Sequence, residues 1–284
     1  MKQRVSLGKL LIYIALSIWA LGTIYPFFWV IMNSFKDRRL IRSESFSLPL
    51  GDKFTINNFT NALSRFNIFG AYRNSIVISG SVTIIVMLLA GLAAYGLGRY
   101  AFRGRKVFQA LVIASMMFPA FSTVLPVFEM QVRWGIAGTS SLARSLLAVS
   151  LPQVAGNMSF AIIVLMGFIR GLPVDMEESA YLEGCNIFQI YFRIVMPLAR
   201  PSFATVAIFT FLWSYNDLFT QFYYLRFPTQ WTVTRLLQEI SSDAGVNYGL
   251  MAASVVLVVV PVLVVYMLLQ KNIIKGLTAG AIKG

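Results

Sequence analysis

Long apolar runs constrain this chain more than any other feature. Six of them lie near residues 10–32, 73–98, 107–130, 146–169, 202–224 and 249–270. A helix needs roughly 20 apolar residues to cross the hydrocarbon core of a bilayer, and each run is about that long. Alternating strands of about ten residues, which would indicate a membrane β-barrel, are not seen. The runs predict an all-α integral membrane protein with six transmembrane helices, forming one transmembrane domain over residues 1–284.

The residue types present exclude several classes of chemistry. The chain is 57% hydrophobic and 12% charged, whereas about a quarter of the residues of a soluble domain are charged. It has no histidine, the usual general base and metal ligand, and its one cysteine, Cys185, cannot form an internal disulfide. We therefore expect no catalytic residues, no metal site and no cofactor of its own in this chain, although carboxylates alone could still support enzymatic chemistry.

The net charge of +13 raises the question of a nucleic-acid partner. The basic residues lie mainly beside the apolar runs, however, and lack the interleaved aromatic residues of an RNA-binding surface. Flanking cations are typical of proteins anchored in a lipid bilayer. We expect a bilayer and no nucleic acid.

Charged loops predict the orientation. Arg99, Arg103, Arg105 and Lys106 crowd one short loop, which favours a cytoplasmic position for it and for both termini. The longer segment 33–72, which holds six Lys and Arg residues, argues the other way. The first run follows several cations and resembles a signal peptide, but it is too long for one, so we expect an uncleaved span.

Small residues and prolines indicate close helix packing within the spans. Ala90, Ala94 and Gly98 recur every four residues, a stripe that lets two helices approach closely. Three prolines fall in the predicted spans: Pro119, Pro126 and Pro261. Each removes a backbone donor and kinks a helix, which suits either plain packing or a moving, pore-lining role.

A short acidic insert, residues 173–197, separates the fourth and fifth runs. Pro173 suits a first helical position, and the acidic residues after it suit the positive end of a helix. Gly184 supplies a turn, and an amphipathic second helix is predicted beyond it. A helix lying on the membrane surface would prefer a basic polar face. The acidic insert therefore favours a protein partner with a basic groove.

The insert carries a family resemblance. Glu178-Ser179-Ala180, three residues, Gly184, nine residues and Ile194-Val195-Met196-Pro197 together resemble the EAA loop of ABC importer permeases. Ser179 and Met196 depart from the family pattern by small changes in volume. Three further stretches resemble the MalG-like carbohydrate permeases of this family: residues 25–36, 211–219 and 270–284.

This resemblance implies a type I ABC importer permease in a bacterial or archaeal cell membrane. The chain would pair with a MalF-like permease as a heterodimer, with core spans near 73–270. Two ATP-binding subunits would hold ATP and Mg, since the chain has no G-x-x-x-x-G-K-[ST] loop. An extracytoplasmic solute-binding protein would deliver a sugar substrate.

The resemblance also implies roles for residues. A coupling helix within loop 170–201 would contact the ATPase, with these candidates: Glu177, Glu178, Ala180, Tyr181, Leu182, Gly184, Ile187 and Pro197. The cytoplasmic tail, 271–284, would reach the same subunit through Lys275, Gly276 and Gly280, unless it is simply a disordered basic end.

Polar and aromatic residues within the spans are candidates for a substrate path. They are Asn157, Trp213, Tyr215, Asn216 and Asp217. Asp217 equally suits a contact between helices, and the partner permease is an alternative holder of the sugar. A permease for a polyamine or a peptide remains open as an alternative function, and a secondary transporter is disfavoured by the absence of an evident repeat.

Overall fold

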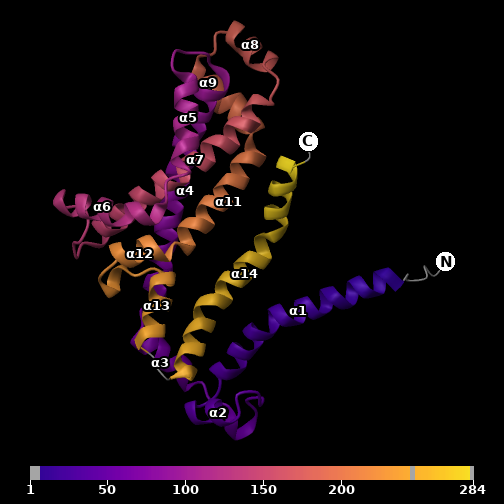
Figure 1. The fold of residues 1–284 in the computed structure, drawn as a ribbon, viewed down its shortest axis with the longest axis vertical. Coiled ribbons are helices and arrows are strands. Elements are labelled where there is room, and N and C mark those ends of the chain that lie inside the picture. The colour runs from indigo at the N-terminus through magenta and orange to yellow at the C-terminus, as the bar shows by residue number, and fades with distance from the viewer. Residues whose placement is uncertain (1–6, 244–246, 282–284) are drawn as a thin grey trace. The chain divides into compact units, whose positions relative to one another are not determined.

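The computed structural model describes residues 7–243 and 247–281, and the described chain is helical with no β-strand. This confirms the all-α prediction. The chain divides into two compact units. The smaller unit comprises Met1–Ile68 and Leu237–Val264, and the larger comprises Phe69–Leu236 and Val265–Gly284. Figure 1 shows the helices of both units and labels most of them.

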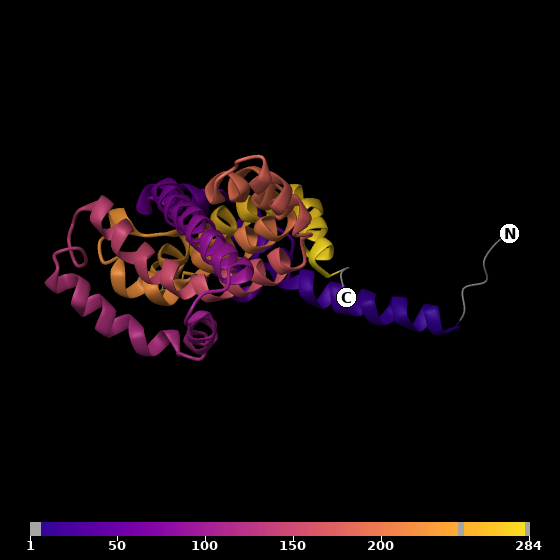
Figure 2. The ribbon, with the colours of Figure 1, turned by 90° about the horizontal axis from the view of Figure 1, so that it is seen from above.

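The smaller unit begins with α1 (Leu7–Ser34), an uninterrupted helix despite Pro26 within it (Figure 2). Its other elements are α2 (Arg38–Ser43), η1 (Gly51–Lys53), α3 (Asn57–Arg65), the end of α13 (Val233–Asp243) and the first part of α14 (Tyr248–Ala281). Asn58 joins α3 to the end of α1, since its Nδ2 donates to the carbonyls of Ser34 and Lys36 at 3.0 and 2.8 Å.

A buried lysine organises the turn after α1. Lys36 is fully buried, and its Nζ donates to Asn33 Oδ1 and to the carbonyls of Glu44 and Ser45 at 3.2, 3.0 and 3.2 Å. Burial lowers the pKa of Lys36 below its ordinary value of 10.5. Three oxygen partners offset part of the desolvation of the ammonium.

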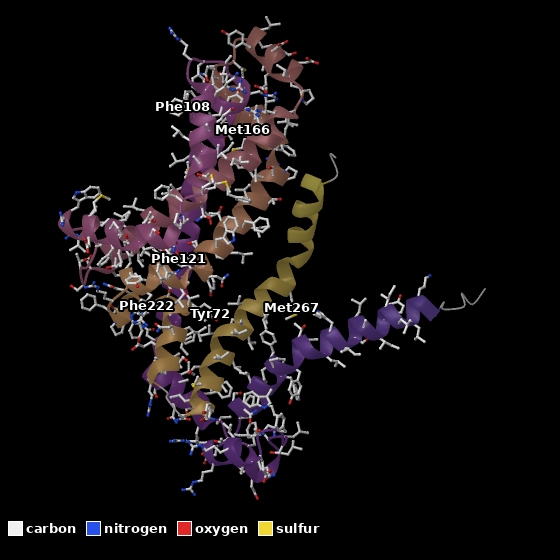
Figure 3. All side chains as sticks on the ribbon, viewed as in Figure 1. Tyr72, Phe108, Phe121, Met166, Phe222 and Met267 are labelled. Atoms are coloured by element: carbon white, nitrogen blue, oxygen red, sulfur yellow. The ribbon has the colours of Figure 1, made fainter. Side chains whose placement is uncertain are left out.

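The larger unit is a helical bundle around α7. Its long helices are α4 (Ile68–Arg99), α5 (Arg105–Ser115), α6 (Ala120–Arg133), α7 (Leu142–Arg170) and α11 (Arg200–Asn216). Its shorter elements are α8 (Asp175–Leu182), α9 (Ile187–Ile190), η2 (Tyr191–Val195), α10 (Met196–Leu198), α12 (Leu218–Tyr224) and η3 (Pro228–Gln230). Helix α7 packs against α5, α6, α11 and α12. Figure 3 shows Phe108 on α5 and Met166 on α7 toward the same end of the unit as α8.

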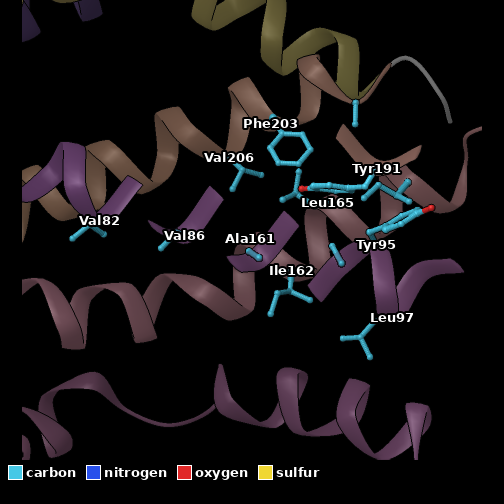
Figure 4. Close-up of a cluster of buried hydrophobic side chains, with 14 of the residues drawn as sticks. Val82, Val86, Tyr95, Leu97, Ala161, Ile162, Leu165, Tyr191, Phe203 and Val206 are labelled. Atoms are coloured by element: carbon cyan, nitrogen blue, oxygen red, sulfur yellow. The ribbon is translucent and has the colours of Figure 1, made fainter. Parts of the chain in front are cut away.

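One face of α4 supplies much of the core. Residues spaced by four along this helix are completely buried: Ile78, Val82, Val86, Ala90 and Ala94. They belong to a cluster with Leu165 of α7 and Phe203 of α11 (Figure 4). A Cβ built on Gly98 would lie 3.6 Å from Met166 Cγ on α7. The predicted stripe of small residues therefore does bring two helices together.

The third and fifth apolar runs differ from the prediction of one continuous helix each. The third run, 107–130, breaks between Ser115 and Ala120, because Pro119 disfavours helix in the residue before it and has no N–H to continue α5. The fifth run, 202–224, breaks at Asp217, whose Oδ1 accepts from the Thr220 N–H at 3.0 Å and starts α12.

Three helices of the described chain are long and apolar enough to cross a membrane alone: Gly8–Ser34, Ile68–Arg99 and Leu142–Arg170. Two further segments, Ile187–Leu198 and Arg200–Asn216, qualify as a pair bent by 80°. The described part of α14 from Tyr248 to Val264 is apolar but shorter. These helices fit a multi-pass membrane protein, and the orientation of the termini stays a prediction.

Candidate functional site

The acidic insert folds as two short helical segments around Gly184. Helix α8 begins at Asp175 rather than at Pro173, which lies just before it. It ends in a Schellman motif, because the Cys185 N–H donates to the Ala180 carbonyl and the Gly184 N–H donates to the Tyr181 carbonyl, both at 3.0 Å. Gly184 has φ +85°, so it provides the predicted turn.

The second half of the insert is more broken than the single amphipathic helix that the spacing predicts. Asn186 caps α9 through a reciprocal pair of hydrogen bonds with Gln189, each 2.9 Å. The π-helical turn η2 then carries the chain to Pro197. Pro197 has no N–H to offer the carbonyl four residues earlier, and a π turn is one way for a helix to absorb such a gap.

An ion pair fastens α8 to the end of α4. Arg99 Nε lies 2.7 Å from Glu177 Oε1, and the two side chains are only 9% and 12% exposed. Arg99 Nη2 also donates to the Leu172 carbonyl at 2.8 Å, and the Tyr95 hydroxyl donates to Glu177 Oε2 at 3.0 Å. Glu177, which we expected to face a partner, is therefore engaged within the chain.

A second contact joins the insert to the middle of the bundle at Gly91. A Cβ on Gly91 would lie 2.9 Å from two ring carbons of Phe203, and closer still to the Tyr191 hydroxyl. The Tyr191 ring also packs on Tyr95, with ring centroids 5.3 Å apart (Figure 4). Glycine at this position thus lets η2 and α11 approach α4.

The remaining candidate residues of the insert divide into an inner and an outer group. Ala180 is buried and Pro197 is half-buried, so both pack within the chain. The outer group is exposed: Glu178, Tyr181, Leu182, Gly184 and Ile187. Leu182 is 87% exposed, Tyr181 is 68% exposed, and Phe188 of the second half of the insert is 65% exposed. We call the exposed residues Glu178, Tyr181, Leu182, Ile187 and Phe188 of the insert the insert face.

The candidate substrate-path residues are not all brought together. Asn157 is buried and its Nδ2 donates to the Gln153 carbonyl at 2.7 Å, while Asn216 Nδ2 donates to the Leu212 carbonyl at 2.8 Å. Tyr215 is buried in the bundle. Asp217 Oδ2 accepts from Gln153 Nε2 at 2.8 Å. With its cap on α12, this contact favours the alternative that Asp217 joins two helices.

Trp213 lies elsewhere, on a cavity of about 670 Å³ in the larger unit. The cavity is lined by residues of α6, α7, α11 and α12 and by the end of α5 with the chain that follows it. None of its lining residues is charged. Sequence reasoning identified Trp213 but missed Gln131, Trp134 and Phe160 on the same cavity, because neighbouring positions on different helices leave no local pattern.

The structure does not test the predicted contact of the tail, residues 271–284, with an ATPase. Lys275, Gly276 and Gly280 belong to helix α14, but their exposure and contacts lie outside the described part of the structure. Their predicted contact with an ATPase stays a prediction.

Comparison with known proteins identifies the family. Residues 87–279 match the family described as binding-protein-dependent transport system inner membrane component. The chain belongs to this family. A diacetylchitobiose uptake system permease, NgcG of Streptomyces coelicolor, is 33% identical over 94% of this chain and 87% of its own length. The trehalose/maltose permease MalG of Thermococcus litoralis is 30% identical, with 98% of each chain covered.

A solved structure shares the fold. A chain of a bacterial ABC transporter that imports the acidic polysaccharide alginate superposes with a TM-score of 0.78 at 20% identity, covering 95% of this chain and 98% of its own. The family members are transport subunits of the membrane rather than enzymes. This chain is accordingly a multi-pass membrane component of a binding-protein-dependent transport system.

Proposed function

We propose that this chain is one permease subunit of an ATP-driven sugar importer and forms half of its translocation path with a MalF-like partner. The names of its relatives support a sugar substrate, since they include permeases for diacetylchitobiose, α-glucosides and arabinooligosaccharides. The observation that carries the proposal is the insert: it exposes apolar side chains on one side and is fixed to α4 on the other.

The insert face suits docking on an ATP-binding subunit. Shifting a two-state equilibrium from 1:99 to 99:1 takes about 5.5 kcal/mol of differential free energy. An exposed ion pair from Glu178 would supply at most about 1 kcal/mol. Burying a side chain such as Leu182 supplies roughly 2 kcal/mol, so the apolar contacts of Tyr181, Leu182 and Ile187 carry most of the docking energy.

Two inner contacts would transmit movement of the insert to α4. The Arg99–Glu177 ion pair holds α8 to the end of α4, and Tyr191 packs against the same helix near Gly91. A rigid element held at two points moves as one body with its neighbour. Closure of the ATPase would thus be converted into movement of α4.

The family resemblance of the sequence supports the other parts of the proposed assembly. Two ATP-binding subunits would hold ATP and Mg on the cytoplasmic side, where both termini of this chain would also lie. The tail residues Lys275, Gly276 and Gly280 would add a second contact there. An extracytoplasmic solute-binding protein would deliver the sugar to the opposite face of the bacterial or archaeal cell membrane.

Reconstitution tests the proposal. The full importer in liposomes, supplied with its binding protein, should take up labelled sugar only when ATP is enclosed with the ATPase subunits. A Leu182→Asp, Tyr181→Asp variant should lose uptake, while Phe69→Asp, which replaces a side chain 80% exposed at the far end of α4, should retain it. Uptake without ATP or ATPase subunits would refute the proposal.

A further inference from the structure

The cavity of about 670 Å³ in the larger unit has an aromatic wall. Phe160 of α7 and Trp213 of α11 meet there with ring centroids 4.8 Å apart, and Trp134 and Phe118 also line the cavity. Flat aromatic surfaces provide large apolar contact at a fixed place. The C–H faces of a pyranose ring are a matching surface, because they are the least polar part of a sugar.

One polar side chain on this cavity has an unused acceptor. Gln131 is only 2% exposed, and its Nε2 donates to the Tyr224 hydroxyl at 3.5 Å. Its Oε1 is buried and has no donor among the described residues. A buried amide oxygen without a donor carries the full penalty of desolvation. A hydroxyl group of a ligand would satisfy it, and an acyl chain of a lipid would not.

The charge of the lining restricts the ligand further. No aspartate, glutamate, lysine or arginine lines the cavity. A carboxylate or an ammonium group entering it would lose hydration without gaining a partner of opposite charge. The hydroxyls of Ser115, Thr123 and Thr220 add neutral polar groups. The volume lies within the roughly 300–1,000 Å³ of small-molecule sites.

We propose that this cavity is a subsite for an uncharged saccharide. A sugar ring packs on Trp213 and Phe160, and a sugar hydroxyl donates to Gln131 Oε1. The inference rests on the proposed function and narrows it, because an acidic sugar is excluded. The proposed substrate is uncharged, whereas the named substrate of the structurally similar alginate importer is an acidic polysaccharide.

Tryptophan emission of the purified permease–ATPase assembly tests the subsite without the selectivity of a binding protein. We expect diacetylchitobiose or maltose to change the emission and an alginate oligosaccharide of similar length to leave it unchanged. Trp213→Phe keeps an aromatic ring and should remove most of the sugar-dependent change. Trp19→Phe is the matched control, since Trp19 is 78% exposed on α1 and should leave the change intact.

Uptake by the reconstituted importer provides the second measurement. Gln131→Leu removes the free acceptor at nearly constant volume, so the half-saturating concentration of a neutral sugar should rise about three- to tenfold. Trp213→Leu should raise it as well, and Trp19→Leu should not. Equal responses to neutral and acidic sugars, or cavity variants that match the wild type in both measurements, would overturn the subsite.

A failure of the proposed function has a different signature. The wild-type importer would then take up none of the neutral or acidic sugars under any condition, and the subsite would fall with it. Uptake of a neutral sugar by the wild type together with unaltered cavity variants would overturn the subsite alone.

Discussion

Arg99 at the end of α4 and Glu177 in the first turn of α8 form a nearly buried ion pair, with 2.7 Å between Nε and Oε1. Removing one member of such a pair leaves an uncompensated charge and costs about 3–5 kcal/mol. Glu177→Ala should therefore destabilise the purified chain by roughly that amount in thermal or denaturant unfolding. The neighbouring Glu178→Ala is the control, because Glu178 is exposed, and should change stability by less than about 0.5 kcal/mol.

Exchanging the two charges separates the ion pair from simple packing. The single variants Arg99→Glu and Glu177→Arg should each lose stability, and the double variant that carries both changes should recover part of that loss. Additive losses in the double variant would mean that the two side chains do not interact as the structure indicates.

Two glycines of α4 should respond in opposite directions to alanine. Gly91→Ala places a methyl group 2.9 Å from ring carbons of Phe203, and such overpacking costs about 1–3 kcal/mol. Gly96→Ala meets nothing within 4 Å and should gain about 0.5–1 kcal/mol from the helix propensity of alanine. The melting temperature should fall for Gly91→Ala and rise for Gly96→Ala. Equal shifts in melting temperature for the two variants would contradict the close approach of η2 and α11 to α4.

Substitution of Gly184 should lower stability because of its backbone conformation and not because of a steric clash. A Cβ there would meet nothing within 4 Å, but φ is +85°. Gly184→Ala should cost about 1–2 kcal/mol from left-handed strain, whereas Gly167→Ala in α7, also without neighbours within 4 Å, should not destabilise. If ATPase stimulation depends on the turn, Gly184→Ala should reduce it while Gly167→Ala leaves it unchanged.

The buried Lys36 should make the stability of the fold depend on pH. Burial lowers its pKa below the ordinary 10.5, so the folded chain releases this proton more readily than the unfolded chain does. The penalty for burying the charged ammonium is complete below the lowered pKa. It is relieved as the pH rises through that pKa toward 10.5, so the contribution of Lys36 to stability should increase over this window.

Lys36→Met isolates this contribution from other titrating groups. The difference in melting temperature between the wild type and this variant should shift in favour of the wild type as the pH rises. A difference that is constant with pH would show that Lys36 has an ordinary pKa.

Sequence patterns over short stretches predicted the helices, one packing face and one turn. Apolar length predicted helices at all six runs, although two of them are broken. The four-residue spacing of Ala90, Ala94 and Gly98 predicted a packing face, and the glycine after the acidic helix predicted the turn at Gly184. Each of these depends on residues close together in the chain.

Contacts between distant segments were beyond the reach of the same reasoning. Neither the pairing of Arg99 with Glu177 nor the fit of Tyr191 against Gly91 has a periodic signature, because each depends on how α4 meets the insert. The cavity is a similar case: Gln131 and Trp213 become neighbours only when α6 and α11 both pack on α7. Pro119 predicted a kink in the third run, but the structure has a complete break at residues 116–119, which the continuous apolar run did not indicate.

Cross-linking at the insert face tests the central claim most directly. In a Cys185→Ser background, which removes the chain's one cysteine, Leu182→Cys should cross-link to an ATP-binding subunit in the assembled importer. Phe69→Cys, an exposed position at the other end of α4, should not cross-link to that subunit. A Leu182→Cys chain that supports full ATP-driven uptake yet never cross-links there would contradict the assignment of residues 173–197 as the coupling element.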